Sequence, residues 1–316
     1  MKEKIKNGRS LKKANKTEEG YILTRRSKGE KILFGCVFAI FVLYALSLIS
    51  PFLYLFFNSL KDGFEYSDDL MAGNTVGLPN AWRFSNYISA FTNMKMTGSS
   101  GQYIYMWQMV LYGVGYSFIS VLAGITASTL VAYALAKYRF RLRGLLYGIA
   151  IFSMTVPVIG NTGAMFKLLT SIGVYNTPFY PVVVGFSGFG FNFLILYGFF
   201  STVSWSYAEA SFIDGAGHFT VLFKVMIPQA LPAMVTLCIM AFITSWNDYL
   251  NVLLYMPDYP TLASGIYQIK LTLIRNLEMY PVYFAGLIIS IVPVMVLFAC
   301  FSNTIMKNFT VGGLKG

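Results

Sequence analysis

The chain alternates between long apolar blocks and shorter polar connections. Six blocks are long enough to cross a bilayer as a helix, which takes about 20 residues. They span Ile32–Phe57, Tyr105–Ala136, Leu145–Leu169, Phe179–Val203, Ala230–Met256 and Tyr280–Met306. These blocks lack the alternating pattern of a barrel strand. Because only helices and closed barrels satisfy their backbone hydrogen bonds in lipid, the pattern predicts an all-α, polytopic membrane protein with six transmembrane helices.

The blocks divide the chain into five segments. Residues 1–31 form a basic tail, residues 32–57 the first transmembrane helix, and residues 58–104 a polar loop. Residues 105–306 form a five-helix core with a polar loop at 204–229, and residues 307–316 form the C-terminal tail. The first block exceeds the 7–15-residue core of a signal peptide, so we expect a retained anchor. The 58–104 loop is interpreted either as a poorly ordered connection or as a surface for a partner.

Composition and charge agree with a chain embedded in lipid. Hydrophobic residues make up 56% of the chain and charged residues 12%, whereas soluble domains have roughly a quarter charged residues. The net charge is +11, but the basic residues flank the apolar blocks, which indicates a lipid bilayer and no nucleic acid as partner. With the N-terminus inside, 18 Lys and Arg lie on the inner side and 6 on the outer. The positive-inside rule then predicts that both termini are cytoplasmic.

The sequence gives little support to catalytic chemistry. It has one histidine, His218, and its three cysteines lie in separate apolar blocks, so no metal site and no catalytic group are expected. It also lacks a G-x-x-x-x-G-K-[ST] phosphate loop, the motif that binds the phosphates of ATP. We therefore expect that the chain binds no cofactor itself and is not an enzyme.

The polar loop at 204–229 carries signals of a short helix. Ser206 and Glu209 have the S-x-x-E spacing of a capping box, which predicts a helix that starts at Ser206. Gly215 predicts its end, because glycine adopts positive φ at little cost. Pro228 and Pro232 mark the entry into the fifth block. Small residues around the helix favour close contact with a groove on another protein: Ala208, Ala210, Ser211 and Ala216.

Two of the predicted spans contain unusual runs of small residues. In the second span such residues recur every four positions, which indicates either static helix packing or a surface that slides during transport; they are Ser120, Gly124, Ser128, Ala132 and Ala136. The fourth span has three glycines close to Asn192. This run either loosens a helix beside a cavity or reflects the frequency of glycine in membrane helices.

The outer part of the fifth span contains four residues that are candidates for a substrate pathway: Trp246, Asn247, Asp248 and Tyr249. A carboxylate at membrane depth is costly, so Asp248 indicates either a substrate path or hydrogen bonding between helices. The rings of Trp246 and Tyr249 either stack on a sugar or belong to the aromatic residues that lie at the membrane interface. Together with Asn192, these residues form the predicted pathway set.

The 204–229 loop resembles a signature of the inner-membrane permease subunits of ABC importers. That signature reads E-A-A, three residues, G, nine residues, I-x-L-P. Here Glu209-Ala210-Ser211 is followed by Gly215 and then by Val225-Met226-Ile227-Pro228. Asp214-Gly215-Ala216 is similar to the D-G-A extension of the signature.

Other stretches resemble the carbohydrate-uptake type of these permeases. Tyr133–Phe140 looks like Y-A-L-A-[RK]-Y-x-F, and Trp246–Tyr249 looks like W-N-[ED]-[FY]. Leu78–Tyr87 is similar to an outer-loop pattern P-x-x-W…N-Y, and Gly312–Gly316 to a G-A-x-K-G ending. The resemblance covers most of residues 30–316 and preserves the order of the motifs.

This resemblance implies a type I ABC importer permease fold in the bacterial cytoplasmic membrane. It implies a heterodimer with a second permease subunit, two ATPase subunits that bind ATP and Mg, and an extracytoplasmic substrate-binding protein. The implied cargo is a sugar or oligosaccharide, and the implied ATPase-coupling residues are Ser206, Glu209, Ala210, Ser211, Asp214, Gly215, Ala216 and Pro228.

Two other kinds of transporter are weighed against this interpretation. One is an ABC permease for peptides or amino acids. The other is a secondary transporter, which more often has an internal repeat and several buried acids. Asp248 is the one acid within the predicted spans, which disfavours the secondary transporter.

Overall fold

The computed structural model describes residues 28–156, 160–273 and 276–311, which are almost entirely helical. The chain divides into two units, Met1–Tyr54 and Leu55–Gly316. Helix α2 (Lys28–Ser59) supplies the described part of the first unit and continues into the second. The basic residues at 1–27 and the Gly312–Gly316 ending lie outside the described residues.

Three long helices form the frame of the second unit: α5 (Met106–Lys137), α12 (Ile227–Trp246) and α15 (Tyr280–Val311). With α2, they provide four helices long and apolar enough to cross a membrane in the described part of the chain. The structure therefore confirms a helical, multi-pass fold. The ends of α2 and α5 lie within a few residues of the predicted first and second spans.

The third and fourth predicted spans are not single helices. The third is replaced by α6 (Arg143–Thr155) and α7 (Thr162–Ser171), and the fourth by α8 (Tyr180–Gly185) and α9 (Phe191–Thr202). The fourth span breaks where Gly190 has a φ of 145°, which residues with a side chain rarely adopt. A continuous helix over Phe179–Val203 was thus a wrong prediction, and the glycine run marks the break.

The helix of the fifth span starts earlier than predicted and also ends earlier. Residues His218–Trp246 form one helical run, made of α11 (His218–Val221), a π-turn (Leu222–Met226) and α12. Pro228 and Pro232 lie inside this run and not at its entry. Pro228 has no N–H to donate, and a wider π-turn directly precedes it. The 204–229 loop is correspondingly shorter, and α10 (Ser206–Ile213) is its separate helix.

The connection between α12 and α15 is helical as well. It contains α13 (Leu250–Tyr255), α14 (Leu262–Leu273) and a 3₁₀ turn (Leu277–Met279). The predicted continuation of the fifth span to Met256 is therefore wrong, because α12 ends at Trp246.

The 58–104 loop has a defined structure, so its interpretation as a poorly ordered connection was wrong. It contains α3 (Gly63–Met71), α4 (Ser85–Asn93) and an antiparallel hairpin of β1 (Lys95–Thr97) with β2 (Tyr103–Tyr105). The Lys61 side chain is fully buried and its Nζ lies 2.6 Å from Asp69 Oδ2. The Asn86 amide donates to the carbonyls of Ser59 and Lys61, each at 2.8 Å. These polar contacts fix the loop.

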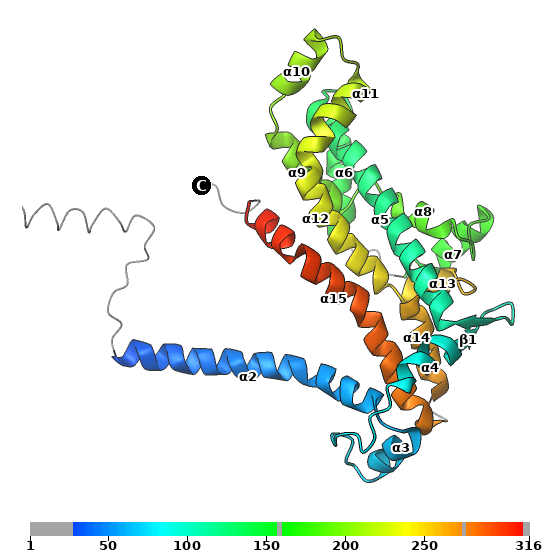
Figure 1. Cartoon of the computed structure of the whole chain (residues 1–316). Coiled ribbons are helices and arrows are strands. Elements are labelled where there is room, and N and C mark those ends of the chain that lie inside the picture. Colours follow the sequence, from blue (N-terminus) through cyan, green and yellow to red (C-terminus); the bar gives the residue numbers. More distant parts are fainter. Residues whose placement is uncertain (1–27, 157–159, 274–275, 312–316) are drawn as a thin grey trace, which may run out of the picture. The chain divides into compact units, whose positions relative to one another are not determined.

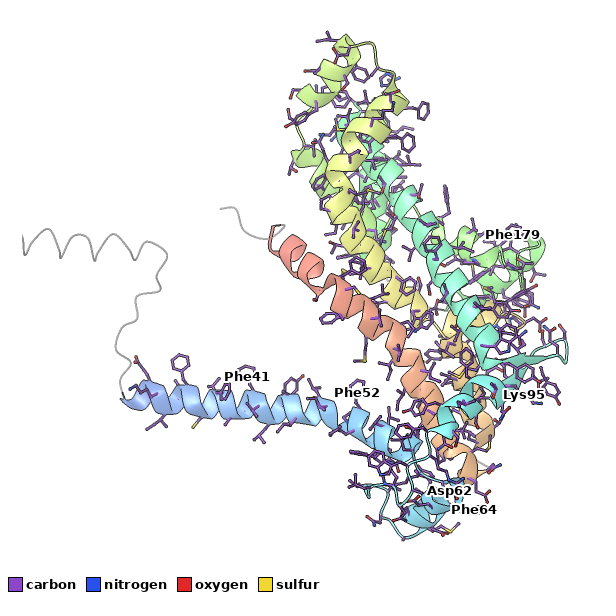
Figure 2. The ribbon with its side chains drawn as sticks, viewed as in Figure 1. Phe41, Phe52, Asp62, Phe64, Lys95 and Phe179 are labelled. Carbon is purple, nitrogen blue, oxygen red and sulfur yellow. The ribbon has the colours of Figure 1, made fainter. Side chains whose placement is uncertain are left out.

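The second unit has two distinct ends. Helices α10 and α11 lie at one end, and α3, α4 and the β-hairpin lie at the other (Figure 1). Asp62 and Lys95 belong to the latter end (Figure 2). The main hydrophobic core runs between α5, α9 and α12 and includes Ala208 of α10, so α10 is packed onto this bundle.

Candidate functional site

A cavity of about 420 Å³ lies between α5, the break that separates α8 from α9, and α12. The residues in its wall include no lysine, arginine or histidine. Hydroxyl, amide and carboxylate groups supply its polarity, from Tyr116, Ser120, Ser128, Ser187, Asn192, Thr244, Ser245 and Asp248. Such a surface can exchange hydrogen bonds with a polar cargo.

The small residues of α5 form one side of this cavity and also allow a close helix contact. A Cβ placed on Gly185 would lie 2.6 Å from the Ser120 carbonyl oxygen, so only glycine fits there. Ser128 Oγ donates to the carbonyl of Ser187 in the break at 3.5 Å. The predicted stripe and the predicted glycine run therefore meet, and the break lines a cavity as one interpretation of the sequence expected.

Asp248 is both a wall residue of the cavity and a link between helices. Its Oδ2 accepts hydrogen bonds from the Tyr116 hydroxyl at 2.8 Å and from the Asn251 amide at 3.0 Å. Its Oδ1 accepts the Asn251 backbone N–H at 3.1 Å. Of the two roles that the sequence offered as alternatives, the structure shows the hydrogen bonding between helices, and the substrate-path role stays a prediction.

The remaining pathway candidates separate into two groups. Asn192 lies in the cavity wall. Trp246 is 3% exposed, and its indole N–H donates to the Ser290 carbonyl at 3.0 Å, so its ring belongs to the core and does not face the cavity. Asn247 and Tyr249 are exposed outside the cavity wall. Sequence reasoning missed Tyr116, although it lies four positions before Ser120 and therefore on the same face of α5 as the small residues.

Helix α10 begins at Ser206, as predicted, but without the predicted capping box. Trp205 is the N-cap residue, and no side chain caps the helix. The Ser206 N–H instead donates to the hydroxyl of Ser204 at 3.3 Å. Glu209 is exposed in the first turn, where its charge suits the helix dipole.

The end of α10 matches its prediction closely. Gly215 has a φ of 83° and follows the C-cap residue Asp214. The Gly215 N–H donates to the Phe212 carbonyl at 3.0 Å, and the Ala216 N–H donates to the Ser211 carbonyl at 2.9 Å. This pair of bonds is a Schellman motif, which satisfies the last carbonyls of the helix.

The surface of α10 is unusually apolar for the end of a helix bundle. Ala208 is fully buried in the core, whereas Ala210 is exposed. Ile213 is 86% exposed and Tyr207 55% exposed, and Phe219 of α11 is 79% exposed. Exposed apolar side chains of this size are candidates for a contact with another protein. Pro228, the last predicted coupling residue, lies on α12 and not on α10.

Aromatic contacts join α10 to the end of α5. The ring of Tyr138 lies 5.9 Å from that of Trp205 and 5.7 Å from that of His218. Its hydroxyl also lies 3.0 Å from His218 Nδ1. Tyr138 directly follows α5, so these contacts connect α10 with the helix that lines the cavity.

Comparison with known proteins identifies several relatives. The diacetylchitobiose uptake system permease protein NgcG of Streptomyces coelicolor is 27% identical over 282 residues, which cover 88% of this chain and 87% of the relative. The trehalose transport system permease protein SugB of Mycobacterium tuberculosis is 26% identical over 271 residues, covering 84% and 92%.

Solved structures show the same fold. A chain of a bacterial ABC transporter involved in the import of the acidic polysaccharide alginate matches with a TM-score of 0.71 and 24% identity, covering 89% of this chain and 99% of that one. A chain of the alginate transporter in complex with an alginate pentasaccharide-bound periplasmic protein matches with a TM-score of 0.59 and 14% identity, covering 90% and 96%. The likeness confirms the type I ABC importer permease fold.

The family described as "Binding-protein-dependent transport system inner membrane component" matches residues 124–307. This match spans more than half of the chain and includes α10, the break before α9 and Asp248. The chain therefore belongs to this family of multi-pass inner-membrane proteins, the permease subunits of ABC importers that work with a separate ATPase.

Proposed function

We propose that this chain is one of two permease subunits of an ATP-driven importer that moves a sugar or oligosaccharide by alternating access. The relatives named for diacetylchitobiose and trehalose support a carbohydrate cargo. The hydroxyl-rich cavity wall suits such a cargo, since it offers several donors and acceptors. The observation that carries the proposal is that α5 lines the cavity and that Tyr138, the residue directly after α5, contacts Trp205 at the start of α10.

The proposed complex contains a second permease, two ATPase subunits that hold ATP and Mg, and an extracytoplasmic substrate-binding protein. Helix α10 enters a groove of one ATPase subunit, with Ala210 at the contact and Tyr207 and Ile213 beside it. Closure of the ATPase moves α10, and Tyr138 transmits this movement to α5. Within the cavity, Asn192 and Asp248 contact the cargo. Trp246, Asn247 and Tyr249 fix the chain around Asp248.

The proposed orientation places both termini and α10 in the cytoplasm. The split of 18 to 6 basic residues supports it. The hairpin, α3 and α4 then lie on the outer side, where the substrate-binding protein docks. The proposed location is the bacterial cytoplasmic membrane.

The coupling role of α10 is tested by replacing Ala210 with Trp. The side chain at 210 is exposed, so the substitution leaves the core of the permease intact and blocks close contact with the ATPase. We expect a normal permease level in the membrane, reduced co-purification of the ATPase, and loss of uptake. Gln102→Trp, exposed at the opposite end, is the matched control and should leave co-purification unchanged. Wild-type co-purification and uptake in the Ala210 variant contradict the proposal.

The cargo class is tested separately. The complex is purified with its substrate-binding protein, and the ligand retained by that protein is identified by mass spectrometry. A mono- or oligosaccharide is expected. A bound peptide or amino acid contradicts the carbohydrate assignment without affecting the coupling role of α10.

A further inference from the structure

A second hollow of about 590 Å³ lies away from the cavity, where α5 ends, α6 begins and α9 ends. Three basic residues line it, Lys137, Arg139 and Arg143. Tyr138, Ser201 and Trp205 contribute polar and aromatic groups. No aspartate or glutamate is among the residues of its wall.

Two of the three cations that line this hollow donate to neutral groups of the chain, and the third, Arg139, is exposed. The Lys137 ammonium donates to the Val203 carbonyl, and the Arg143 guanidinium donates to the Tyr197 hydroxyl at 3.4 Å. The ion pairs found among the described residues involve other cations, Lys61 and Arg83, both near α3 at the opposite end of the unit. The hollow therefore concentrates positive charge that no described carboxylate of the chain neutralises.

The location of the hollow indicates which anion can reach it. Lys137 is the last residue of the apolar helix α5, and Arg143 is the first residue of α6. Basic and aromatic side chains at the ends of spanning helices lie at the boundary between hydrocarbon and headgroups. Basic pockets between helices at this depth bind anionic lipid headgroups.

We propose that this hollow binds the phosphate headgroup of an anionic phospholipid. The site is independent of the cargo and requires only that α5 spans the membrane. The negative phosphate lies among Lys137, Arg139 and Arg143, attracts all three cations, and steadies the turn between α5 and α6. Tyr138 and Trp205 line this hollow, and their rings contact each other at the start of α10. The bound lipid therefore also holds α10 in place.

Native mass spectrometry of the complete, delipidated transporter tests the site. The probes are palmitoyl-oleoyl phosphatidylglycerol, palmitoyl-oleoyl phosphatidylcholine and inorganic phosphate. Wild type is expected to bind phosphatidylglycerol in preference to phosphatidylcholine. The variant Lys137→Gln/Arg139→Gln/Arg143→Gln should bind it roughly a hundredfold more weakly, since each basic residue near an anionic surface contributes about a fivefold factor in affinity. Lys224→Gln, an exposed cation of the π-turn outside the hollow, is the matched control and should bind as wild type.

A single substitution tests the site even if the triple variant does not fold. Arg139 is exposed, so Arg139→Gln keeps the contacts of Lys137 and Arg143 and should lose about fivefold in affinity. Equal binding of phosphatidylcholine and phosphatidylglycerol overturns the proposal, as does wild-type binding by Arg139→Gln. Displacement of phosphatidylglycerol by equimolar inorganic phosphate identifies a site for soluble phosphate and overturns the lipid assignment.

Discussion

Asp248 links two helices and also lies in the wall of the cavity. Its carboxylate ties Tyr116 of α5 to Asn251 of α13 and faces the cavity at the same time. An asparagine of the same shape keeps an oxygen that accepts from Tyr116, but it removes the charge.

We predict that Asp248→Asn leaves the complex assembled and lowers uptake by about tenfold, the effect of weakening one charge-assisted hydrogen bond. Uptake in cells and permease level by immunoblot are the measurements. Glu278→Gln, which makes the same change at an exposed carboxylate outside the cavity wall, is the control and should transport normally. Normal uptake with Asp248→Asn removes this carboxylate from the pathway.

Asp258 ties together three loops at the end of the unit that contains the hairpin. Its carboxylate accepts hydrogen bonds from the hydroxyls of Ser99 and Ser100 and from the Asn176 amide at 2.8 Å. The Asp258 N–H donates in return to Asn176 Oδ1 at 3.0 Å. Burial alone favours the neutral acid, but the bonds from Ser100, Ser99 and Asn176 outweigh it and hold the pKa of Asp258 well below its usual range.

This lowered pKa gives a pH prediction. The folded-state pKa lies below the unfolded value of about 3.9, so the ionised group stabilises the fold above that pH and loses this effect as pH falls through the folded pKa. Asp258→Asn should lower the free energy of unfolding by about 1 kcal/mol near neutral pH. The difference from wild type should shrink below about pH 4, as measured by thermal unfolding of the purified complex. A difference that keeps its full size down to the lowest measurable pH contradicts the assignment.

At the scale of elements, the contact between α5 and α8 depends on the lack of a side chain at Gly185. The methyl group of alanine would lie 2.6 Å from the Ser120 carbonyl, so the helices must separate to accept it. We predict that Gly185→Ala lowers the free energy of unfolding by about 1–3 kcal/mol, as expected for overpacking, and reduces uptake. The control is Gly198→Ala on α9, where a Cβ has no neighbour within 4 Å. Equal stability of the two variants contradicts a tight contact.

The success of the sequence-based predictions also differs between elements. The apolar blocks located α2 and α5 to within a few residues, because a helix that crosses lipid must be apolar over its whole length. Hydropathy does not report backbone geometry, so the break at Gly190 and the π-turn before Pro228 were not located by it. In both cases the local residue type, glycine or proline, was the relevant signal.

The candidate site was predictable where the signal lies in the sequence itself. A carboxylate in an apolar span and a glycine run beside Asn192 pointed to the cavity wall, and the positive φ of Gly215 was predicted from its place after α10. The position of Trp246 in the core was not predictable, because its partner Ser290 lies 44 residues away on α15. Contacts between distant helices have no signature in one sequence, so burial of this ring required the structure.

At the scale of the whole molecule, the direction of transport depends on which end of the second unit faces the cytoplasm. Helix α10 lies at one end, and the hairpin with α3 and α4 lies at the other (Figure 1). The basic hollow includes Trp205, the residue directly before α10. The cations Lys137, Arg139 and Arg143 line the hollow at the first end, and the positive-inside rule predicts that this end faces the cytoplasm.

This orientation predicts how two single cysteines react in a variant that lacks Cys36, Cys238 and Cys300. Asn80→Cys, in the loop between α3 and α4, should react in intact cells with a thiol reagent that does not cross the membrane. Thr310→Cys should react only after the membrane is permeabilised, because the positive-inside rule places the C-terminus inside. Uptake by both variants is the control for correct insertion. Labelling of position 310 from outside, with protection of position 80, reverses the topology and places α10 on the wrong side of the membrane to meet an ATPase.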